Sequence, residues 1–323
     1  MNIQKTPRYS IADSAGLIQV IAHFIHFDIF IFILNGIIHP ARRVYSLSLS
    51  TVVTVTSSIP GSCCFTGFLH QGDPKGEIEQ INNFRVYVAR PEGDKTPNKA
   101  VILLSDIFGI SPNSQLVADA FAVNGHLCVL SDLFNGDQVS IADYDAKAID
   151  IGAWISRHTV EDVAPIVEAT IKYLRTNLDV QNVAAAGYCF GGKYVVRYLK
   201  AGQLDSGYIA HPSFVTKEEL GAIQRPLSIS AAGTICLPYP ARSLYLLWLN
   251  KSLTSSEHDP IFTMANRHAS EETLIGTGQE FQINLFSAVS HGFAIREDIS
   301  QPRVRFSKEQ AFAQAVAWFN HTL

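Results

Sequence analysis

Residues 183–192 read Val-Ala-Ala-Ala-Gly-Tyr-Cys-Phe-Gly-Gly, and the rest of the chain can be interpreted around this stretch. A small apolar run ends in Gly187, Cys189 follows two residues later, and residues 193–199 have the pattern of a helix start. The segment therefore predicts a strand, a sharp turn and a helix, with Gly-x-Cys-x-Gly-Gly at the turn. The glycines fit a turn at which a Cβ atom would collide with a neighbouring strand or helix.

A cysteine on such a turn is placed for nucleophilic chemistry. In α/β-hydrolases the nucleophile sits on a strained strand-to-helix turn that lifts its side chain to the top of the sheet. The N-terminus of the following helix favours a thiolate over a thiol at Cys189. The alternative is a buried structural cysteine beside a Gly-rich turn, because so short a motif stays a hypothesis until its context is known.

Length and composition limit the classes of protein to consider. A chain of 323 residues with 47% hydrophobic residues can form one large α/β domain or two small ones. The net charge of −4 gives no reason to expect nucleic acid or an acidic membrane as partner. The number of cysteines, five, is odd, and they show no Cys-x-x-Cys or zinc-site spacing. We therefore expect free thiols in a reducing, cytoplasmic compartment, with neither a metal nor a cofactor.

The N-terminal region differs in character from the rest. Residues 17–38 are apolar and long enough for a membrane helix, but Asp28 lies inside them. A central Asp costs about 2.5–3.5 kcal/mol on insertion, so the span is a weak one. Residues 1–58 are a membrane anchor, a disordered extension or translated sequence upstream of the true start. We favour the last two, with the folded domain covering residues 59–323.

Beyond this region, apolar runs alternate with helical patterns. The predicted strands are Phe84–Ala89, Ala100–Ser105, His126–Leu130, Val183–Ala186, Ser206–Ala210, Leu227–Ala231 and Gln282–Phe286. The predicted helices are Gln115–Asn124, Asp143–Ile155, Val160–Asn177, Lys193–Leu199 and Lys308–His321. This alternation predicts an α/β fold, a mostly parallel sheet with helices on both faces. The loops after its strands then share one edge, where ligands bind.

From about Pro60 onward the chain resembles the dienelactone hydrolase family, in particular its fungal branch. The matching stretches are residues 60–68 (Pro-Gly-Ser-Cys-Cys-Phe-Thr-Gly-Phe), 105–109 (Ser-Asp-Ile-Phe-Gly), 132–137 (Asp-Leu-Phe-Asn-Gly-Asp), 187–192 (Gly-Tyr-Cys-Phe-Gly-Gly), 210–214 (Ala-His-Pro-Ser-Phe) and 290–293 (Ser-His-Gly-Phe). The resemblance implies an α/β-hydrolase fold with a Cys-Asp-His triad. It also implies hydrolysis of dienelactone-like cyclic esters or of related small esters.

Two members of the triad can be assigned from chemistry and chain order. Cys189 would attack the ester carbonyl and carry the acyl group. His291, in Val-Ser-His-Gly-Phe, follows a predicted strand and comes last in chain order, as this fold requires. It would accept the thiol proton and later activate water. His211 is the main rival, but its loop comes too early in the chain.

The acid of the triad is less directly marked. In the family it follows the strand that Leu227–Ala231 matches here. Residues 233–256 interrupt the pattern, and we interpret them as an insert, either a foreign segment such as a retained intron or a lid. The pattern resumes just before Asp259, which therefore matches the triad acid. Asp205 and Glu218 are the alternatives.

Backbone N–H groups should form the oxyanion hole. The donors would be Phe190, directly after the nucleophile, and Ile107, in the loop after the strand Ala100–Ser105. Asp106 matches a Glu that contacts the resting thiol in bacterial relatives, and its alternative role is that of a turn residue. Bacterial relatives also bind the substrate carboxylate with arginines, whereas the matching loop 135–137 has none. This difference argues against the dienelactone itself as substrate.

The sequence thus predicts a hydrolase of small or cyclic esters that forms a thioester acyl-enzyme. The expected partner is a small ester or lactone substrate, with no nucleic acid, with a membrane only through residues 17–38, and with the oligomeric state left open. Two other kinds of protein remain possible. One is a thiol-based binding or redox-responsive protein that uses Cys189 without hydrolysis. The other is a catalytically impaired homologue whose insert disrupts the site.

Overall fold

The structure of the protein is a computed structural model that describes residues 70–93, 98–233 and 259–323. The expected extension (1–58) and, except for Gly233, the expected insert (233–256) lie outside these residues, so both remain predictions. Residues 17–38 also lie outside them. Within the described ranges, no helix is long and apolar enough to cross a bilayer.

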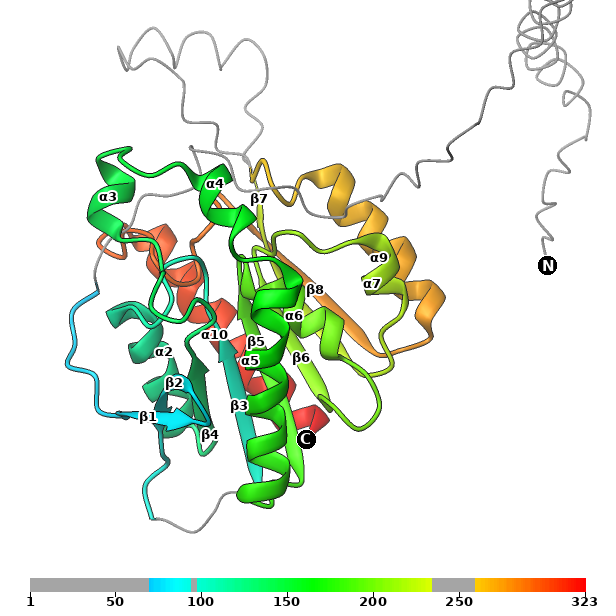
Figure 1. The fold of residues 1–323 in the computed structure, drawn as a ribbon. Helices are drawn as coiled ribbons and strands as arrows, with labels where there is room; N and C mark the ends of the chain where they lie inside the picture. The colour runs from blue at the N-terminus through cyan, green and yellow to red at the C-terminus, as the bar shows by residue number, and fades with distance from the viewer. Residues whose placement is uncertain (1–69, 94–97, 234–258) are drawn as a thin grey trace, which may run out of the picture. The chain divides into compact units, whose positions relative to one another are not determined.

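A sheet of eight strands forms the centre of the described part of the chain (Figure 1). The strands are β1 (Glu77–Ile81), β2 (Phe84–Ala89), β3 (Lys99–Leu104), β4 (Leu127–Ser131), β5 (Asn182–Tyr188), β6 (Ser206–Ala210), β7 (Leu227–Gly233) and β8 (Phe281–Ser287). They lie in the order β1-β2-β4-β3-β5-β6-β7-β8. β2 pairs antiparallel with both β1 and β4, whereas the other neighbours pair in parallel. The sheet is therefore mostly parallel, as predicted.

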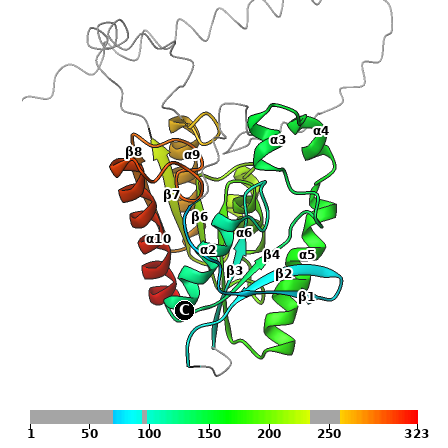
Figure 2. The ribbon, with the colours of Figure 1, turned by 90° about the vertical axis from the view of Figure 1, so that its left-hand side faces the viewer.

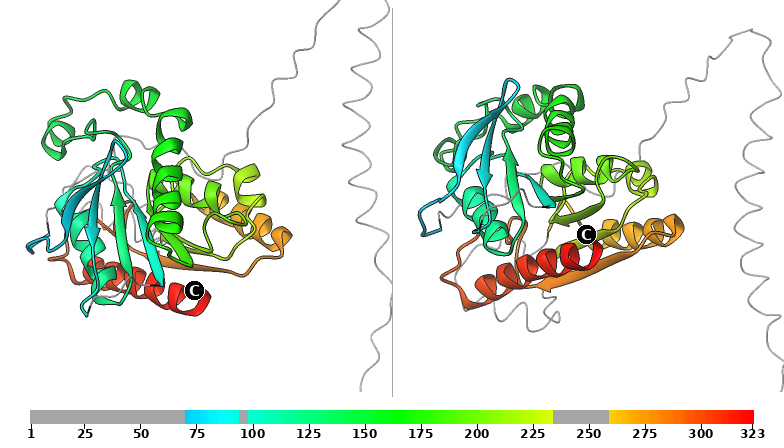
Figure 3. Two further views of the ribbon diagram at one scale, coloured as in Figure 1. Left: turned by 60° about the horizontal axis from the view of Figure 1, so that its bottom comes forward. Right: turned by 90° about the horizontal axis from the view of Figure 1, so that it is seen from below.

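Helices cover both faces of this sheet. They are α2 (Pro112–Val123), α3 (Ile141–Asp145), α4 (Ile151–Ser156), α5 (Val160–Lys172), the π-helical turn η2 (Tyr173–Asn177), α6 (Gly191–Tyr198), α7 (Lys217–Gly221), α9 (Met264–Thr277) and α10 (Pro302–Thr322). α2 and α10 pack on one face, and α5 and α6 pack on the other. Figure 2 shows the strands between α10 and α5, and Figure 3 shows α10 running along one side of the sheet.

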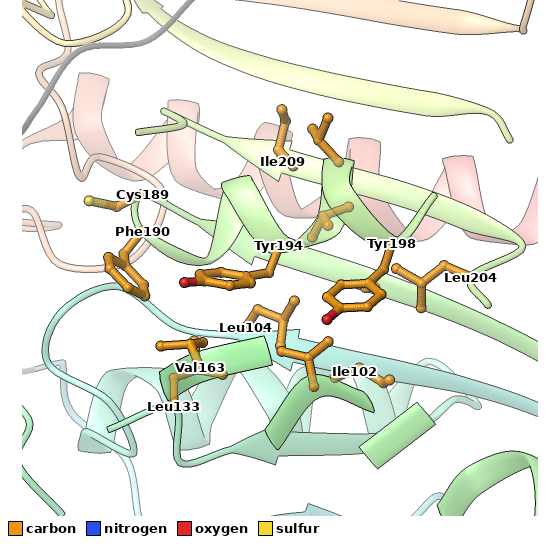
Figure 4. Close-up of a cluster of buried hydrophobic side chains, with 14 of the residues drawn as sticks. Ile102, Leu104, Leu133, Val163, Cys189, Phe190, Tyr194, Tyr198, Leu204 and Ile209 are labelled. Carbon is orange, nitrogen blue, oxygen red and sulfur yellow. The ribbon is translucent and has the colours of Figure 1, made fainter. Parts of the chain in front are cut away.

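The central strands are apolar because both faces of the sheet are covered. β3 reads Lys-Ala-Val-Ile-Leu-Leu and β5 reads Asn-Val-Ala-Ala-Ala-Gly-Tyr, and every residue after the first in each is buried. Figure 4 shows part of the core on the α5 and α6 face, where Leu104, Val163 and Tyr194 lie together. Cys189 and Phe190 lie at one end of this cluster, so the predicted nucleophile is supported directly by the core.

The boundaries of several elements differ from the prediction. The helix expected over Asp143–Ile155 is two short helices, α3 and α4, because Lys147 between them has a φ of 53° that a helix cannot contain. The helix expected over Val160–Asn177 ends as the π-turn η2. β1 was not predicted, because this edge strand is mostly exposed and its Glu-Ile-Glu-Gln-Ile carries little apolar signal.

The close packing at Gly191 predicts a large difference between two Gly→Ala variants. A Cβ atom at Gly191 would lie 2.1 Å from the Leu104 carbonyl oxygen, whereas a Cβ at Gly276 in α9 would meet nothing within 4 Å. We expect Gly191→Ala to lower the free energy of unfolding by about 3 kcal/mol. The control Gly276→Ala should raise it by about 0.5 kcal/mol, because alanine favours a helix. Urea unfolding measures both, and equal stabilities would contradict the assigned packing.

Candidate active site

The turn after β5 holds Cys189 in an unusual backbone conformation. Its φ is 51°, in the left-handed region that non-glycine residues seldom adopt, and the residue is fully buried. The Cys189 N–H donates to the carbonyl oxygen of Ala210 at the end of β6 (3.1 Å), and α6 begins two residues later. Backbone strain of this kind is concentrated at functional sites, where the surrounding structure maintains it. The strand, turn and helix predicted from the sequence are thus present.

Two glycines make this turn possible. A Cβ at Gly187 would lie 2.8 Å from the carbonyl group of Gly191, and a Cβ at Gly191 would collide with β3. The Gly191 N–H donates to the carbonyl oxygen of Ser105 directly after β3 (3.0 Å). The collisions predicted from the sequence are therefore confirmed at both positions. The loop that carries Ile107 also begins next to the turn that carries Phe190.

His291 and Asp259 lie in contact, although 32 residues separate them in the chain. His291 lies between β8 and α10, and its Nδ1 is 3.1 Å from both carboxylate oxygens of Asp259. Both side chains are only 1% exposed. Asp259 Oδ1 also accepts hydrogen bonds from the N–H groups of Ile261 and Phe262, each at 2.9 Å. These backbone donors fix the carboxylate, and the carboxylate in turn orients the imidazole.

The electrostatic surroundings of His291 favour its protonated form. Burial lowers the pKa of His291, but the charges of Asp259 and Cys189, and a hydrogen bond to each, raise it to about 9. Burial raises the pKa of Asp259, yet the charge of His291 and the hydrogen bonds to the carboxylate lower it overall. At neutral pH His291 is therefore an imidazolium that pairs with the Asp259 carboxylate.

Asp106 pairs with an arginine that the sequence analysis did not identify. Its Oδ2 accepts a hydrogen bond from Arg296 Nη1 at 2.7 Å, and both side chains are 2% exposed. Its Oδ1 accepts from the Phe108 N–H at 3.0 Å, and the guanidinium lies 5.5 Å from the Phe108 ring centre. No hydrogen bond within the described ranges joins Asp106 to Cys189. The carboxylate expected beside the thiol therefore anchors the loop after β3 to the segment that carries His291.

The loop after β6 brings two further polar residues to the site. Ser213 Oγ lies 3.3 Å from Cys189 Sγ, and the Ser213 N–H donates to the Cys189 carbonyl oxygen at 3.0 Å. The rings of His211 and His291 are 4.9 Å apart between centres. Burial, followed by the charges of His291 and Arg296, lowers the pKa of His211 well below its usual range, so this imidazole is neutral. His211 is thus a neighbour of His291 rather than the partner of Asp259.

The alternative acids lie elsewhere. Asp205 Oδ2 is bonded to Arg175 (2.6 Å) and to the Val183 N–H at the start of β5, which is the opposite edge of the sheet. Glu218 is exposed on α7. Over the described ranges, no group of three or more His, Cys, Asp or Glu side chains could hold a metal ion.

Comparison with known proteins identifies the family. The sequence profile of the Dienelactone hydrolase family matches residues 84–234 and 252–323. Hydrolase pyvD of Aspergillus violaceofuscus is 43% identical over 270 residues, which cover 83% of this chain and 99% of that protein. Hydrolase tropI of Talaromyces stipitatus is 40% identical over 274 residues, which cover 82% of this chain and 97% of that protein.

A solved structure agrees with the fold. The crystal structure of dienelactone hydrolase from Anabaena variabilis has a TM-score of 0.52 to this chain at 15% identity, covering 79% of this chain and all of that one. Together with the mostly parallel sheet between helices, this likeness confirms the predicted α/β-hydrolase fold. The chain therefore belongs to the dienelactone hydrolase family and is an enzyme that hydrolyses esters or lactones.

Proposed function

We propose that Cys189, His291 and Asp259 form a catalytic triad that hydrolyses small or cyclic esters through a thioester acyl-enzyme. The observation that carries this proposal is the contact of His291 Nδ1 with both carboxylate oxygens of Asp259, at an imidazole whose pKa the nearby Cys189 also helps to raise. The positive φ of Cys189 at the start of α6 supports the assignment, because α/β-hydrolase nucleophiles occupy such turns.

The proposed reaction has two halves. In the first, the Cys189 thiolate attacks the ester carbonyl, and the His291 imidazolium donates its proton to the leaving alkoxide. In the second, neutral His291 accepts a proton from water, and the resulting hydroxide attacks the thioester. The acid is released, and Cys189 and His291 return to the thiolate and imidazolium. Asp259 stabilises the imidazolium and keeps the ring in one orientation throughout.

Two backbone N–H groups are available for the oxyanion of each tetrahedral intermediate. Neither the Ile107 N–H nor the Phe190 N–H donates a hydrogen bond to another residue of the described part of the chain. The bond between the Gly191 N–H and Ser105 holds their two segments together. We therefore propose Ile107 and Phe190 as the oxyanion-hole donors, with Asp106 as a support that fixes the Ile107 loop through Arg296.

The substrate that we propose is a small or cyclic ester whose recognition requires no arginine from the loop after β4. In this loop, Asn135 and Gly136 carry no charge. Asp137 Oδ2 is bonded to Arg157 and His158, each at 3.0 Å. The loop thus contributes a carboxylate where bacterial relatives are expected to contribute a guanidinium.

Covalent trapping of the nucleophile tests the proposal. We expect the protein to hydrolyse p-nitrophenyl acetate, and Cys189→Ala to abolish this activity. Iodoacetamide near neutral pH should modify Cys189 before Cys128, because burial raises the pKa of Cys128 well above its usual range. Mass spectrometry of a short incubation should find the acyl group on the Cys189 peptide.

A turnover that survives Cys189→Ala would reject the proposed nucleophile. A wild-type protein that iodoacetamide modifies at Cys189, but that does not hydrolyse p-nitrophenyl acetate even before this treatment, would instead favour the thiol-based binding or redox function, or an impaired homologue. Cys128→Ala is the matched control, and it should leave both activity and acyl-enzyme formation unchanged.

Replacement of the other two triad members should have graded effects. His291→Ala should lower kcat by on the order of 10⁶-fold, and Asp259→Asn by about 10⁴-fold, as the corresponding losses in a serine triad suggest. The smaller loss is expected because Asp259 orients the imidazole and transfers no proton itself. Steady-state kinetics measure both, and wild-type kcat in Asp259→Asn would assign the acid elsewhere. Asp145→Asn, on the exposed side of α3, is the control for loss of a carboxylate.

The pKa of His291 also predicts the basic limb of the pH profile. For an alkyl ester, acylation should slow as the pH rises through about 9, because His291 then loses the proton that the leaving alkoxide needs. Asp259→Asn should move this limb to lower pH, because it removes the charge that contributes most to raising the pKa of His291. An unchanged limb in the residual activity of that variant would contradict the assigned contact.

A further inference from the structure

Ser213 contacts the sulfur of the proposed nucleophile from a loop that the proposed reaction does not use. The two side-chain atoms are 3.3 Å apart, and both residues are fully buried. Within the described ranges, Cys189 Sγ is the one hydrogen-bond partner of Ser213 Oγ. This hydroxyl therefore has no structural bond of its own to account for its burial.

The backbone of the loop is built to hold this contact. The Ser213 N–H donates to the Cys189 carbonyl oxygen (3.0 Å), and the Cys189 N–H donates to Ala210 (3.1 Å). Two residues of the loop, His211 (φ 39°) and Phe214 (φ 60°), lie in the left-handed region. Left-handed conformations at non-glycine residues cost free energy, so the surrounding packing must enforce this path of the loop.

We propose that Ser213 is a positioning residue whose hydroxyl donates a hydrogen bond to the Cys189 thiolate and holds it, before substrate binds, in the conformation from which it attacks. This inference rests on the proposed triad and adds a fourth side chain to it. A thiolate can only accept hydrogen bonds, so the hydroxyl must be the donor whenever His291 holds the proton. Hydrogen bonds to an ionised partner are stronger than those between neutral groups.

The bond should act on the resting enzyme rather than on the acyl-enzyme. Once the sulfur is part of a thioester it carries no charge, and the hydroxyl loses its strong acceptor. Removing Ser213 Oγ should therefore reduce the thiolate fraction at low pH. It should leave a sulfur that is at least as nucleophilic at high pH, where every cysteine is ionised, because nucleophilicity rises as a thiolate is less stabilised.

The other charged and titratable groups around the sulfur define what the test must keep constant. His291, backed by Asp259, approaches Cys189 from the segment between β8 and α10. The Asp106–Arg296 ion pair lies at the end of β3, and the neutral imidazole of His211 lies on the loop of Ser213 itself. The N-terminus of α6 follows Cys189 directly. None of these groups is changed by a substitution at Ser213.

The experiment compares Ser213→Ala and Ser213→Thr with the wild type by the rate of Cys189 alkylation as a function of pH. We expect Ser213→Ala to move the half-maximal rate upward by about one pH unit, which makes alkylation about tenfold slower at a pH well below both midpoints. At the high-pH plateau the variant should react at least as fast as the wild type. Ser213→Thr keeps the hydroxyl and should restore the wild-type profile. kcat/KM for p-nitrophenyl acetate should fall in parallel over the same pH range.

Ser270→Ala is the matched control. Its hydroxyl is also buried, but it bonds to the Asn266 carbonyl oxygen on α9 (2.9 Å), so the alkylation profile should not move. If Ser213→Ala lowers the alkylation rate equally at every pH and leaves the midpoint unchanged, Ser213 has a packing role and the proposal is overturned. A profile identical to that of the wild type would also overturn it. If the alanine variant does not fold, Ser213→Gly carries the same test. Failure of the triad itself would appear separately, as esterase activity that survives Cys189→Ala.

Discussion

The close approach of α6 to the end of β3 is the constraint on which the rest of the site depends. At Gly191 the backbone of the helix lies against the Leu104 carbonyl with no room for a Cβ, and the Gly191 N–H bonds to Ser105. A helix that starts so close to the sheet leaves two residues to turn the chain after β5. Cys189 therefore takes a positive φ. The same approach sets the loop of Ile107 beside Phe190, so the strained backbone of the proposed nucleophile and the placement of the two proposed oxyanion donors follow from one packing contact.

Most of the sheet could be predicted from the sequence, because each central strand is a short apolar run bounded by turn residues. Predicted and observed bounds agree for β2 and β6, and they differ by a few residues for β3, β4, β5, β7 and β8. The elements that were missed or misjudged have local patterns that tertiary structure overrides. β1 is a polar edge strand that pairs with β2, and the break at Lys147 depends on one backbone conformation that the residue type does not mark. The periodicity of apolar residues predicts a strand or helix only where one face of the element is buried, so it does not identify an exposed element such as β1.

The part of the candidate site that could be predicted is the part that chain order and the resemblance to the family indicate. Cys189, Asp259 and His291 each follow a strand at the same edge of the sheet, so their proximity was expected. The contact of Ser213 with Cys189 and that of Arg296 with Asp106 were not expected. Arg296 meets Asp106 across 190 positions of the chain, and a buried arginine resembles a surface arginine in sequence. The stretch Ala-His-Pro-Ser-Phe did mark the loop of Ser213, but only the fold shows that its hydroxyl reaches the sulfur.

Charge balance in this buried site links its chemistry to its stability. The His291 imidazolium pairs with the Asp259 carboxylate and Arg296 pairs with Asp106, whereas His211 faces two cations and stays neutral. A third cation there would lack a counter-charge, which burial makes costly. Because the pKa of His291 is raised from 6.5 to about 9, its contribution to stability is complete below pH 6.5 and is lost as the pH rises through about 9. The pKa of Asp259 is lowered, so its contribution is present above pH 3.8 and is lost as the pH falls further. These ion pairs thus stabilise the fold most between about pH 3.8 and 6.5, and the loss of the imidazolium above about pH 9 removes the His291 contribution.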